Sequence, residues 1–308
     1  MKNLINEILE LKKERNAIIL AHNYQRPEIQ DIADFVGDSL GLSREAIDTK
    51  AEVIVFCGVD FMAETASILN PDKTVLIPDK SAICPMAMML KVGDIKVAKE
   101  KYPNAETVLY INSTAETKTE ADCICTSANA PETINAMNSD TILFGPDKNL
   151  AYFVEKRTKK RIIPVPEDGV CPTHHQLSKD DFLNSLKKYP NAELVVHPEV
   201  IPEVQEMATH IASTEGMLEY CKKSNSKEFI IGTENGIIHR LKREIPGKKF
   251  YAASEIATCP AMKMITLEKV RDSLKELKYE VRIPEEISMK AKEAIDCMLS
   301  HHSKNDPL

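Results

Sequence analysis

Three Cys-Pro dipeptides at nearly equal spacing are the feature of this sequence most suited to chemistry. Cys84-Pro85, Cys171-Pro172 and Cys259-Pro260 lie 87 and 88 residues apart, from 84 to 171 and from 171 to 259. Packing of three like domains around a pseudo-threefold axis would bring the three thiolates to one centre. A 4Fe-4S cluster accepts thiolates that are distant in sequence, and three ligands leave one iron open as a Lewis acid. Structural zinc prefers four ligands, often in local Cys-x₂-Cys pairs, which are absent here. The expected chemistry is loss of water from a substrate.

Polar residues recur with the same period as the cysteines. Alignment of the copies on three Asn-Ala pairs, at 16, 104 and 191, brings nine polar residues into register. They are His22, Tyr110 and His197, then Tyr24, Asn112 and Glu199 two residues on, and Ser39, Ser127 and Thr214 seventeen residues after the first set. Residues i and i+2 of an extended segment point to the same side, and open parallel sheets bind ligands at their carboxyl ends. The hydroxyl residues lie at or near expected helix starts, where free N–H groups bind phosphate or carboxylate.

Strands and helices must alternate to position these residues. The string Lys-Tyr-Pro-Asn-Ala-Glu occurs at 101–106 and 188–193, and glycines at 58, 145 and 232 end three apolar runs. Apolar runs predict strands at 17–21, 53–56, 74–77, 107–109, 141–144, 161–163, 194–196, 229–231 and 250–251. Helical spacing follows each strand, including one continuous stretch near 29–46. The expected fold is α/β, with three similar three-layer αβα domains and small parallel sheets around a pseudo-threefold axis. Their expected boundaries are 1–90, 91–177 and 178–308, the last including closing helices.

Composition and charge restrict the partners and the location. The 308 residues carry a net charge of −7 without a basic stripe, which argues against nucleic acid and favours small-molecule substrates. The N-terminus reads as an amphipathic helix, with neither a signal peptide nor a membrane span. Eight cysteines without a secretion signal indicate a cytoplasmic protein whose thiols serve metal or redox chemistry more often than disulfides.

Other residues leave two interpretations open. Cys57, Cys221 and Cys297 read as small buried apolar residues. Cys123 and Cys125 form either a redox or ligand pair or nothing functional, because the other copies show no counterpart. His174 and His175 follow Cys171 without a counterpart, so they are either functional or exposed loop residues.

Motifs distributed over the whole chain resemble those of the quinolinate synthase family. They are Ala21-His22-Asn23-Tyr24-Gln25, Gly37-Asp38-Ser39, Cys57-Gly58-Val59, Ile83-Cys84-Pro85-Met86, Tyr110-Ile111-Asn112, Cys125-Thr126-Ser127-Ala128-Asn129, Cys171-Pro172-Thr173-His174, His197-Pro198-Glu199, Ser213-Thr214-Glu215-Gly216 and Thr258-Cys259-Pro260. The resemblance implies a triangular arrangement of three αβα domains around a 4Fe-4S cluster held by three cysteines. It also implies condensation of iminosuccinate with dihydroxyacetone phosphate to quinolinate, with loss of phosphate and two waters, in de novo NAD biosynthesis.

The resemblance also implies roles for individual residues. The implied cluster ligands are Cys84, Cys171 and Cys259. Eight residues are implied to contact substrate: His22, Ser39, Tyr110, Asn112, Ser127, His197, Glu199 and Thr214. Glu199 and Tyr24 are the leading acid–base residues, and His174 is a further candidate. An iminosuccinate-producing enzyme is the implied partner. Some relatives carry Cys-x₂-Cys-x₂-Cys at the third ligand, whereas Pro260-Ala261-Met262 follows Cys259 here, so a disulfide switch at that position is not available.

Three other classes of function stay open from the residues alone. One is a different 4Fe-4S hydro-lyase that uses the same Lewis-acid chemistry. Another is a non-catalytic metal-binding scaffold, in which the polar residues at the strand ends would tolerate substitution. The third is a triplicated sugar-phosphate isomerase without a metal, which would keep its activity after loss of the three cysteines.

Overall fold

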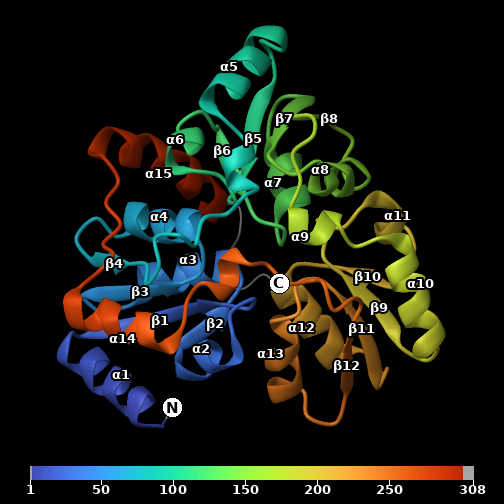
Figure 1. The fold of residues 1–308 in the computed structure, drawn as a ribbon. Helices are drawn as coiled ribbons and strands as arrows, with labels where there is room; N and C mark the ends of the chain where they lie inside the picture. The colour runs from blue at the N-terminus through green and yellow to red at the C-terminus, as the bar shows by residue number, and fades with distance from the viewer. Residues whose placement is uncertain (1, 301–308) are drawn as a thin grey trace. The chain divides into compact units, whose positions relative to one another are not determined.

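Three parallel four-stranded sheets carry the fold in the computed structural model, which describes residues 2–300 (Figure 1). The first sheet contains β1 (Ala17–His22), β2 (Phe35–Gly37), β3 (Val53–Cys57) and β4 (Thr74–Leu76), in the order β2-β1-β3-β4. The second contains β5 (Glu106–Tyr110), β6 (Cys123–Cys125), β7 (Thr141–Gly145) and β8 (Arg161–Pro164), in the order β6-β5-β7-β8. The third contains β9 (Glu193–Val196), β10 (His210–Ile211), β11 (Glu228–Gly232) and β12 (Lys249–Ala252), in the order β10-β9-β11-β12. The topology is therefore the same in all three, which confirms the α/β class and the three similar parallel sheets.

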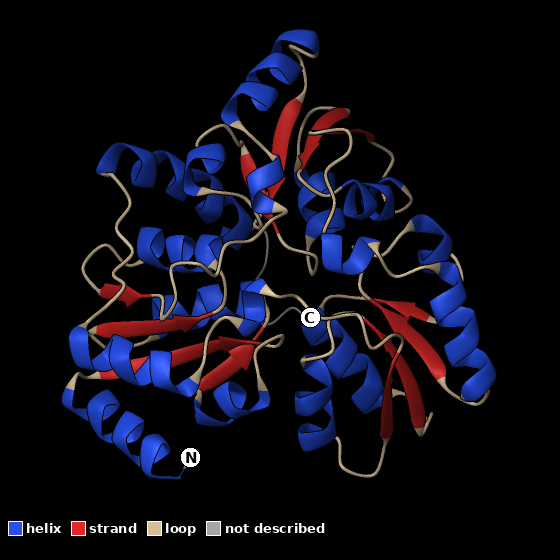
Figure 2. Cartoon of the chain, in the orientation of Figure 1, coloured by secondary structure: helices blue, strands red, loops and turns tan. Residues whose placement is uncertain are grey.

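Helices precede or follow the strands in each sheet, as Figure 2 shows by colour. Around the first sheet these are α1 (Lys2–Glu14), α2 (Pro27–Ile32), α3 (Ser39–Asp48), α4 (Asp60–Leu69) and α14 (Leu267–Glu276). Along the second are α5 (Val92–Lys101), α6 (Ala115–Lys118), α7 (Ala130–Ala136), α8 (Lys148–Glu155) and α9 (Pro172–His175). Along the third are α10 (Lys179–Lys188), α11 (Pro202–Gln205), α12 (Thr214–Lys223) and α13 (Ile237–Glu244), and the last described helix is α15 (Glu285–Ser300). Short 3₁₀ turns, η1 (Ala87–Met89) and η2 (Ala261–Lys263), follow two of the Cys-Pro steps.

The chain forms two compact units. One contains residues 1–84 and 259–289, and the other contains residues 85–258 and 290–308, as far as these are described. In the first unit α1 and α14 pack on the first sheet through Ile8, Val270 and Leu274. In the second, Phe182 and Val204 help to bury one face of the third sheet. The division at 90 and 177 and the pseudo-threefold axis stay predictions. No helix within residues 2–300 combines the length and the apolar character needed to cross a membrane.

All nine predicted strands are present. Among them the central strands are the most deeply buried, as in β3, where every residue is buried. The continuous helix expected near 29–46 is wrong, since β2 separates α2 from α3. In each sheet, a side chain just before the second strand accepts a backbone N–H from the neighbouring strand and so holds the second strand at the sheet edge. Asp34 Oδ2 accepts the N–H of Ile19 at 2.8 Å, and Asp122 Oδ2 accepts that of Thr107 at 2.7 Å. Thr209 Oγ1 accepts the N–H of Leu194 at 3.1 Å, so the same contact occurs in all three sheets.

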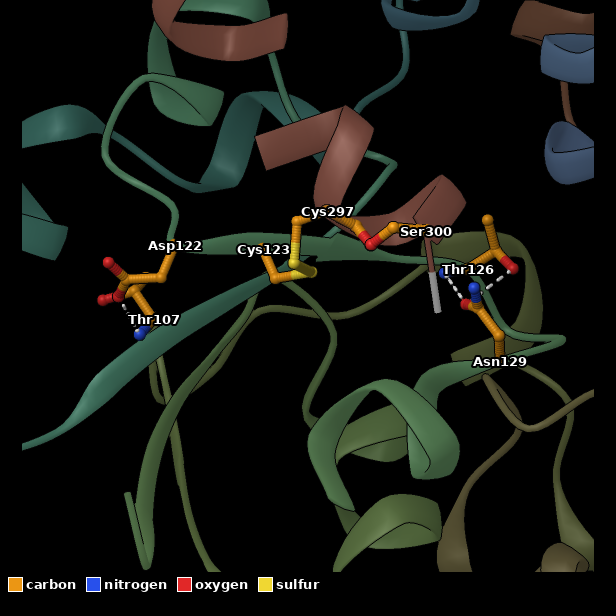
Figure 3. Close-up of a disulfide and its surroundings, with 7 residues drawn as sticks. All are labelled: Thr107, Asp122, Cys123, Thr126, Asn129, Cys297 and Ser300. Carbon is orange, nitrogen blue, oxygen red and sulfur yellow. Dashed lines mark hydrogen bonds between the residues drawn. A yellow bond between two sulfur atoms is a disulfide. The ribbon is translucent and has the colours of Figure 1, made fainter. Parts of the chain in front are cut away.

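A disulfide between Cys123 and Cys297 corrects the expectation for these cysteines (Figure 3). It joins β6 to α15 across 174 residues of sequence. Cys297 is therefore not simply a buried apolar residue, and Cys123 does not form a pair with Cys125, which is a buried free thiol. The preference for metal or redox use over disulfides is wrong for this pair. Cytoplasmic location, which rested partly on the same argument, stays a prediction.

Candidate active site

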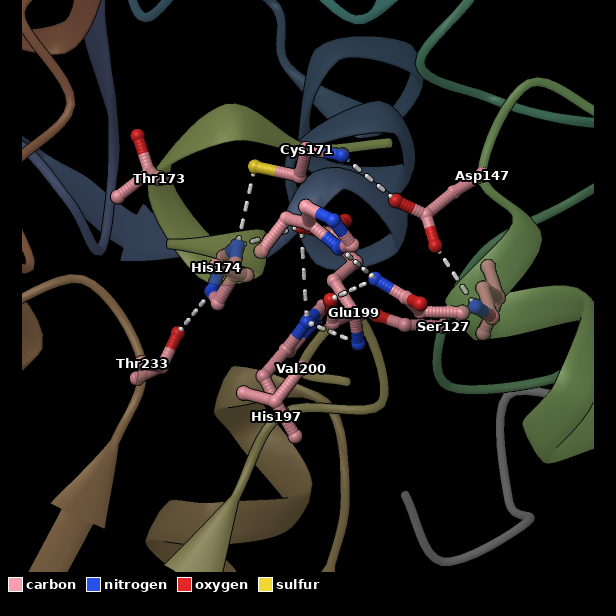
Figure 4. Close-up of polar contacts among 12 residues, drawn as sticks. Ser127, Asp147, Cys171, Thr173, His174, His197, Glu199, Val200 and Thr233 are labelled. Carbon is pink, nitrogen blue, oxygen red and sulfur yellow. Dashed lines mark hydrogen bonds and ion pairs between the residues drawn. The ribbon is translucent and has the colours of Figure 1, made fainter. Parts of the chain in front are cut away.

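The carboxylate of Glu199 is the centre of a buried polar cluster in the second unit (Figure 4). Glu199 lies just past the end of β9, and Tyr110 ends β5. The Tyr110 hydroxyl donates to Glu199 Oε1 at 2.7 Å, and His174 Nδ1 lies 2.7 Å from Glu199 Oε2. His197 Nδ1 is 3.8 Å from the same oxygen. The carboxylate thus has a phenol and two imidazoles around it, away from water.

His174 connects this carboxylate to one of the three Cys-Pro cysteines. The short helix α9 begins at Pro172 and places His174 Nδ1 3.1 Å from Cys171 Sγ. The other ring nitrogen, Nε2, is 2.7 Å from Thr233 Oγ1, one residue past β11. Ligand atoms of Cys171, His174 and Glu199 all lie within 4.8 Å of one another, which is close enough to hold a metal ion. Of the two histidines left open by the sequence, His174 therefore belongs to the cluster.

His197 joins Ser127 to the same cluster. Its Nε2 is 3.1 Å from Ser127 Oγ, and its ring stacks on that of His174 with centroids 4.9 Å apart. Asn112, two residues past Tyr110, has a buried Oδ1 atom without a hydrogen-bond partner among the described residues. A buried amide oxygen without a partner is costly, so this atom is suited to a ligand that donates a hydrogen bond. Thr214 is buried and is the first residue of α12.

The electrostatics of the cluster favour a charged carboxylate and a neutral imidazole. Burial alone would raise the pKa of Glu199, but His197, His174 and the Tyr110 hydroxyl lower it below its usual range. Burial lowers the pKa of His197 to about 4, against the smaller opposing effect of Glu199. Burial, together with the charge of Glu199, holds the pKa of Asp147 well above its usual range. Glu199 is therefore ionised and His197 neutral near pH 7.

The first unit shows the same local geometry at its own candidate residues. His22 ends β1, and its Nδ1 accepts the N–H of Tyr24 at 3.2 Å, just as His197 Nδ1 accepts the N–H of Glu199 at 3.4 Å. The rings of His22 and Tyr24 meet edge to face, with centroids 4.6 Å apart. Ser39 begins α3, which Asp38 caps. The alignment of the copies thus matches the local structure, while the roles of these residues toward substrate stay predictions.

The three Cys-Pro cysteines differ in exposure from the other cysteines outside the disulfide. Cys84, Cys171 and Cys259 are partly exposed, whereas Cys57, Cys125 and Cys221 are buried. Burial raises the pKa of Cys221 to about 12 and also raises the pKa of Cys57 and Cys125. Metal ligation requires a thiolate. The buried set, whose thiols stay protonated near pH 7, is therefore poorly suited to metal ligation.

Sequence reasoning missed residues that support the cluster. Asn149 Nδ2 donates to the backbone oxygen of Glu199 at 2.9 Å, and Asp147 Oδ2 accepts the N–H of Cys171 at 2.8 Å. Thr233 holds His174 as described above. Asp147 and Thr233 lie two and one residues after the repeated glycines at 145 and 232, so the repeat itself contained a signal for both.

Comparisons with known proteins agree with this geometry. Residues 6–300 match the family model described as quinolinate synthetase A protein. The chain is 55% identical over 297 residues to a quinolinate synthase of Methanosarcina barkeri, which covers 96% of this chain and 97% of the relative. It is 57% identical to one of Pyrococcus horikoshii, with 96% and 98% covered, and 53% identical to one of Thermodesulfovibrio yellowstonii, with 96% and 97% covered. Matches this extensive, over a chain whose polar cluster lies at the ends of repeated parallel strands, establish that the chain is an enzyme of the quinolinate synthase family.

Proposed function

We propose that this chain condenses iminosuccinate with dihydroxyacetone phosphate to quinolinate, with loss of phosphate and two waters, in de novo NAD biosynthesis. The observation that supports this most directly is the buried Glu199 carboxylate, held by Tyr110 and His174 beside the thiol of Cys171. Such an arrangement suits repeated proton transfer next to a metal site. An iminosuccinate-producing enzyme is the proposed partner, and the proposed location is the cytoplasm.

Cys84, Cys171 and Cys259 are the proposed ligands of one 4Fe-4S cluster. Their equivalent positions in the repeat and their shared partial exposure support this choice. When bound, the cluster would supply an iron with an open position, which acts as a Lewis acid toward a substrate oxygen. A specific alternative is a single metal ion held by Cys171, His174 and Glu199, whose ligand atoms lie close together. Iron and sulfide content distinguishes the two, because a single ion brings no sulfide.

The residues of the chain supply proton transfer and binding in this proposal. Glu199, ionised because its pKa is lowered, accepts a proton from substrate, and His174 Nδ1 at 2.7 Å offers the next position for that proton. Tyr110 keeps the carboxylate oriented through its hydroxyl. His197 and Asn112 present neutral polar groups to substrate, and Tyr24 is a second acid–base residue beside His22.

Hydroxyl groups near helix starts are the proposed contacts for the anionic substrates. Ser39 and Thr214 are first residues of α3 and α12, and Ser127 precedes α7 by three residues. Helix N-termini attract phosphate and carboxylate because their first N–H groups have no partner within the helix. Iminosuccinate and dihydroxyacetone phosphate together carry two carboxylates and one phosphate. The three hydroxyl positions therefore suit this pair of substrates.

The test is quinolinate formation from the two substrates by protein prepared without oxygen, comparing the parent with Glu199→Gln. Loss of the general base should lower kcat by about 10²–10⁴-fold and leave the iron and sulfide content unchanged. The matched control is Glu206→Gln, an exposed glutamate of the same unit that bonds Tyr152, which should retain the parent kcat. An unchanged kcat in Glu199→Gln would reject the catalytic role.

The same assay separates the other classes of function. A different 4Fe-4S hydro-lyase would contain iron and sulfide but make no quinolinate. A metal-binding scaffold would make none and tolerate substitution of Glu199. A metal-free isomerase would keep its activity after replacement of all three Cys-Pro cysteines.

A further inference from the structure

An acidic residue lies two positions after each repeated glycine at the end of a central strand. The three glycines are Gly58, Gly145 and Gly232, and the acidic residues are Asp60, Asp147 and Glu234. Two are aspartates that begin or cap a helix, since Asp60 is the first residue of α4 and Asp147 is the N-cap of α8. Helix capping alone is a common reason for an aspartate at such a position. The contacts of these carboxylates, however, extend beyond their helices.

Each aspartate holds the backbone N–H of a Cys-Pro cysteine. Asp60 Oδ1 accepts from the Cys84 N–H at 2.9 Å, and Asp147 Oδ2 accepts from the Cys171 N–H at 2.8 Å. The two partners are 24 residues apart in both copies. A backbone bond accompanies each contact, because Asp60 N donates to Ala82 O at 2.8 Å and Lys148 N donates to Gly169 O at 2.9 Å. Each loop that carries a Cys-Pro cysteine is thus bonded to the start of a helix at two points. One is the N–H of the cysteine, and the other is the backbone oxygen of the residue two positions before the cysteine.

The loop that carries Cys171 is also fixed by close backbone packing. Asp147 uses both oxygens, because Oδ1 accepts the N–H of Leu150 at 2.7 Å while Oδ2 holds Cys171, as Figure 4 shows for the latter. A Cβ atom on Gly145 would lie 1.9 Å from Val165 O, and one on Gly169 would lie 2.0 Å from Pro146 O. Only glycine permits this approach. The backbone of Cys171 is therefore set relative to the strand end.

We propose that Asp60 and Asp147 are positioning residues that hold Cys84 and Cys171 in the orientation required for cluster ligation. This inference rests on the proposed function, in which these cysteines bind the cluster. A backbone N–H that loses its acceptor no longer holds the cysteine loop against the start of the helix. A site with only three protein ligands depends on each of them, so a cysteine that can move releases the cluster more readily. In the third copy Glu234 is fully buried and its Oε2 accepts the N–H of Gly236 at 2.7 Å.

The test uses variants that separate capping from cysteine positioning. Asp147→Ser keeps an oxygen that can cap α8 but is too short to hold both partners, and Asp60→Ala removes the bond to Cys84. Asp60→Asn keeps an acceptor oxygen and is the conservative rescue. The matched control is Ser178→Ala, which removes the cap of α10 without touching a Cys-Pro cysteine. All are full-length chains, purified and reconstituted without oxygen.

The first measurement is the rate at which cluster absorbance is lost in the presence of an iron chelator, together with iron and sulfide per chain. Loss of the hydrogen bond that holds the cysteine N–H should accelerate cluster loss by about tenfold or more in Asp147→Ser and Asp60→Ala. Asp60→Asn and Ser178→Ala should stay near the parent rate. Equal rates in all five proteins would overturn the inference.

The second measurement uses cluster-free protein and therefore does not depend on the proposed function. Alkylation by iodoacetamide, mapped by peptide, should accelerate at Cys171 in Asp147→Ser and at Cys84 in Asp60→Ala, each by several-fold and without change at the other cysteine. Unchanged or non-selective alkylation contradicts positioning. A reconstituted parent without iron and sulfide contradicts the proposed function, and the alkylation rates then decide the positioning role alone. If Asp147→Ser fails to fold, the Asp60→Ala and Asp60→Asn pair decides it.

Discussion

Protonation of His197 should destabilise the folded chain as the pH falls from 7 to 5. The imidazole is buried, stacks on His174 and bonds Ser127, and burial lowers its pKa from 6.5 to about 4. In the unfolded chain His197 regains its ordinary pKa, so between these two values the unfolded chain binds more protons than the folded one. The contribution of neutral His197 to the free energy of unfolding is therefore present above pH 6.5 and is lost as the pH falls toward 4.

The expected size of this effect follows from the two pKa values. A shift of one pKa unit corresponds to about 1.4 kcal/mol. With pKa values of 6.5 and about 4, the linkage relation gives a loss of about 2 kcal/mol in the free energy of unfolding between pH 7 and pH 5. Replacement of His197 by Gln removes the titrating group and keeps a polar amide near Ser127. The pH dependence in this range should therefore become shallower by about 2 kcal/mol.

The assay is denaturant unfolding of cluster-free protein at a series of pH values. Parent and His197→Gln are compared as a difference, because Asp147, whose pKa is raised, titrates in the opposite sense. Val196→Ala serves as the control, since it truncates a buried residue beside His197 without removing a titrating group. It should lower stability equally at all pH values. Parallel pH curves for parent and His197→Gln would refute the buried neutral state of this imidazole.

Two further predictions test neighbouring features. Tyr110→Phe removes the 2.7 Å hydrogen bond to Glu199, so kcat should fall by about tenfold or more. The acidic limb of the kcat/KM profile should also move to higher pH, because the charged carboxylate loses a hydrogen-bond donor. An acidic limb at the parent's pH would argue against this hydrogen bond. Reduction of the Cys123–Cys297 disulfide opens a loop spanning 174 residues and should cost up to about 5 kcal/mol. Thermal unfolding with and without reductant should show a large drop in Tm for the parent and none for Cys297→Ser, whereas a parent insensitive to reductant would contradict a stabilising disulfide.

The repeat made much of this fold predictable from the sequence. Buried parallel strands require unbroken apolar runs, so the runs before Gly58, Gly145 and Gly232 identified three central strands directly. The missed β2 contains three residues at a sheet edge, and Ile29, Ile32 and Val36 share a helical spacing that runs through it. A hydrogen bond from the Ile19 N–H to the Asp34 side chain helps to hold this edge strand in the sheet. Such a contact joins residues that are distant in sequence, so the local sequence does not reveal it.

The site was predictable to a similar degree and for the same reason. The alignment of the three copies placed Tyr110, His197 and Glu199 at strand ends, and the structure brings their side chains together. His174 has no counterpart in the other copies, so symmetry gave no information about its position between Cys171 and Glu199. The pairing of Cys123 with Cys297 also breaks the repeat and spans most of the chain. The internal repeat therefore predicted the residues that have counterparts in the other copies. The positions of residues without counterparts depend on tertiary contacts.

The most direct test of the central claim is the iron and sulfide content of the anaerobic protein in two sets of single Cys→Ser variants. We expect the parent to hold about four iron and four sulfide per chain, as a 4Fe-4S cluster requires. Replacement of Cys84, Cys171 or Cys259, the partly exposed set, should abolish stable loading and quinolinate formation, whereas replacement of the buried Cys57, Cys125 or Cys221 should leave loading intact. Zinc or a single sulfide-free metal ion in the parent, or full loading after loss of any one of the first three cysteines, would contradict the account.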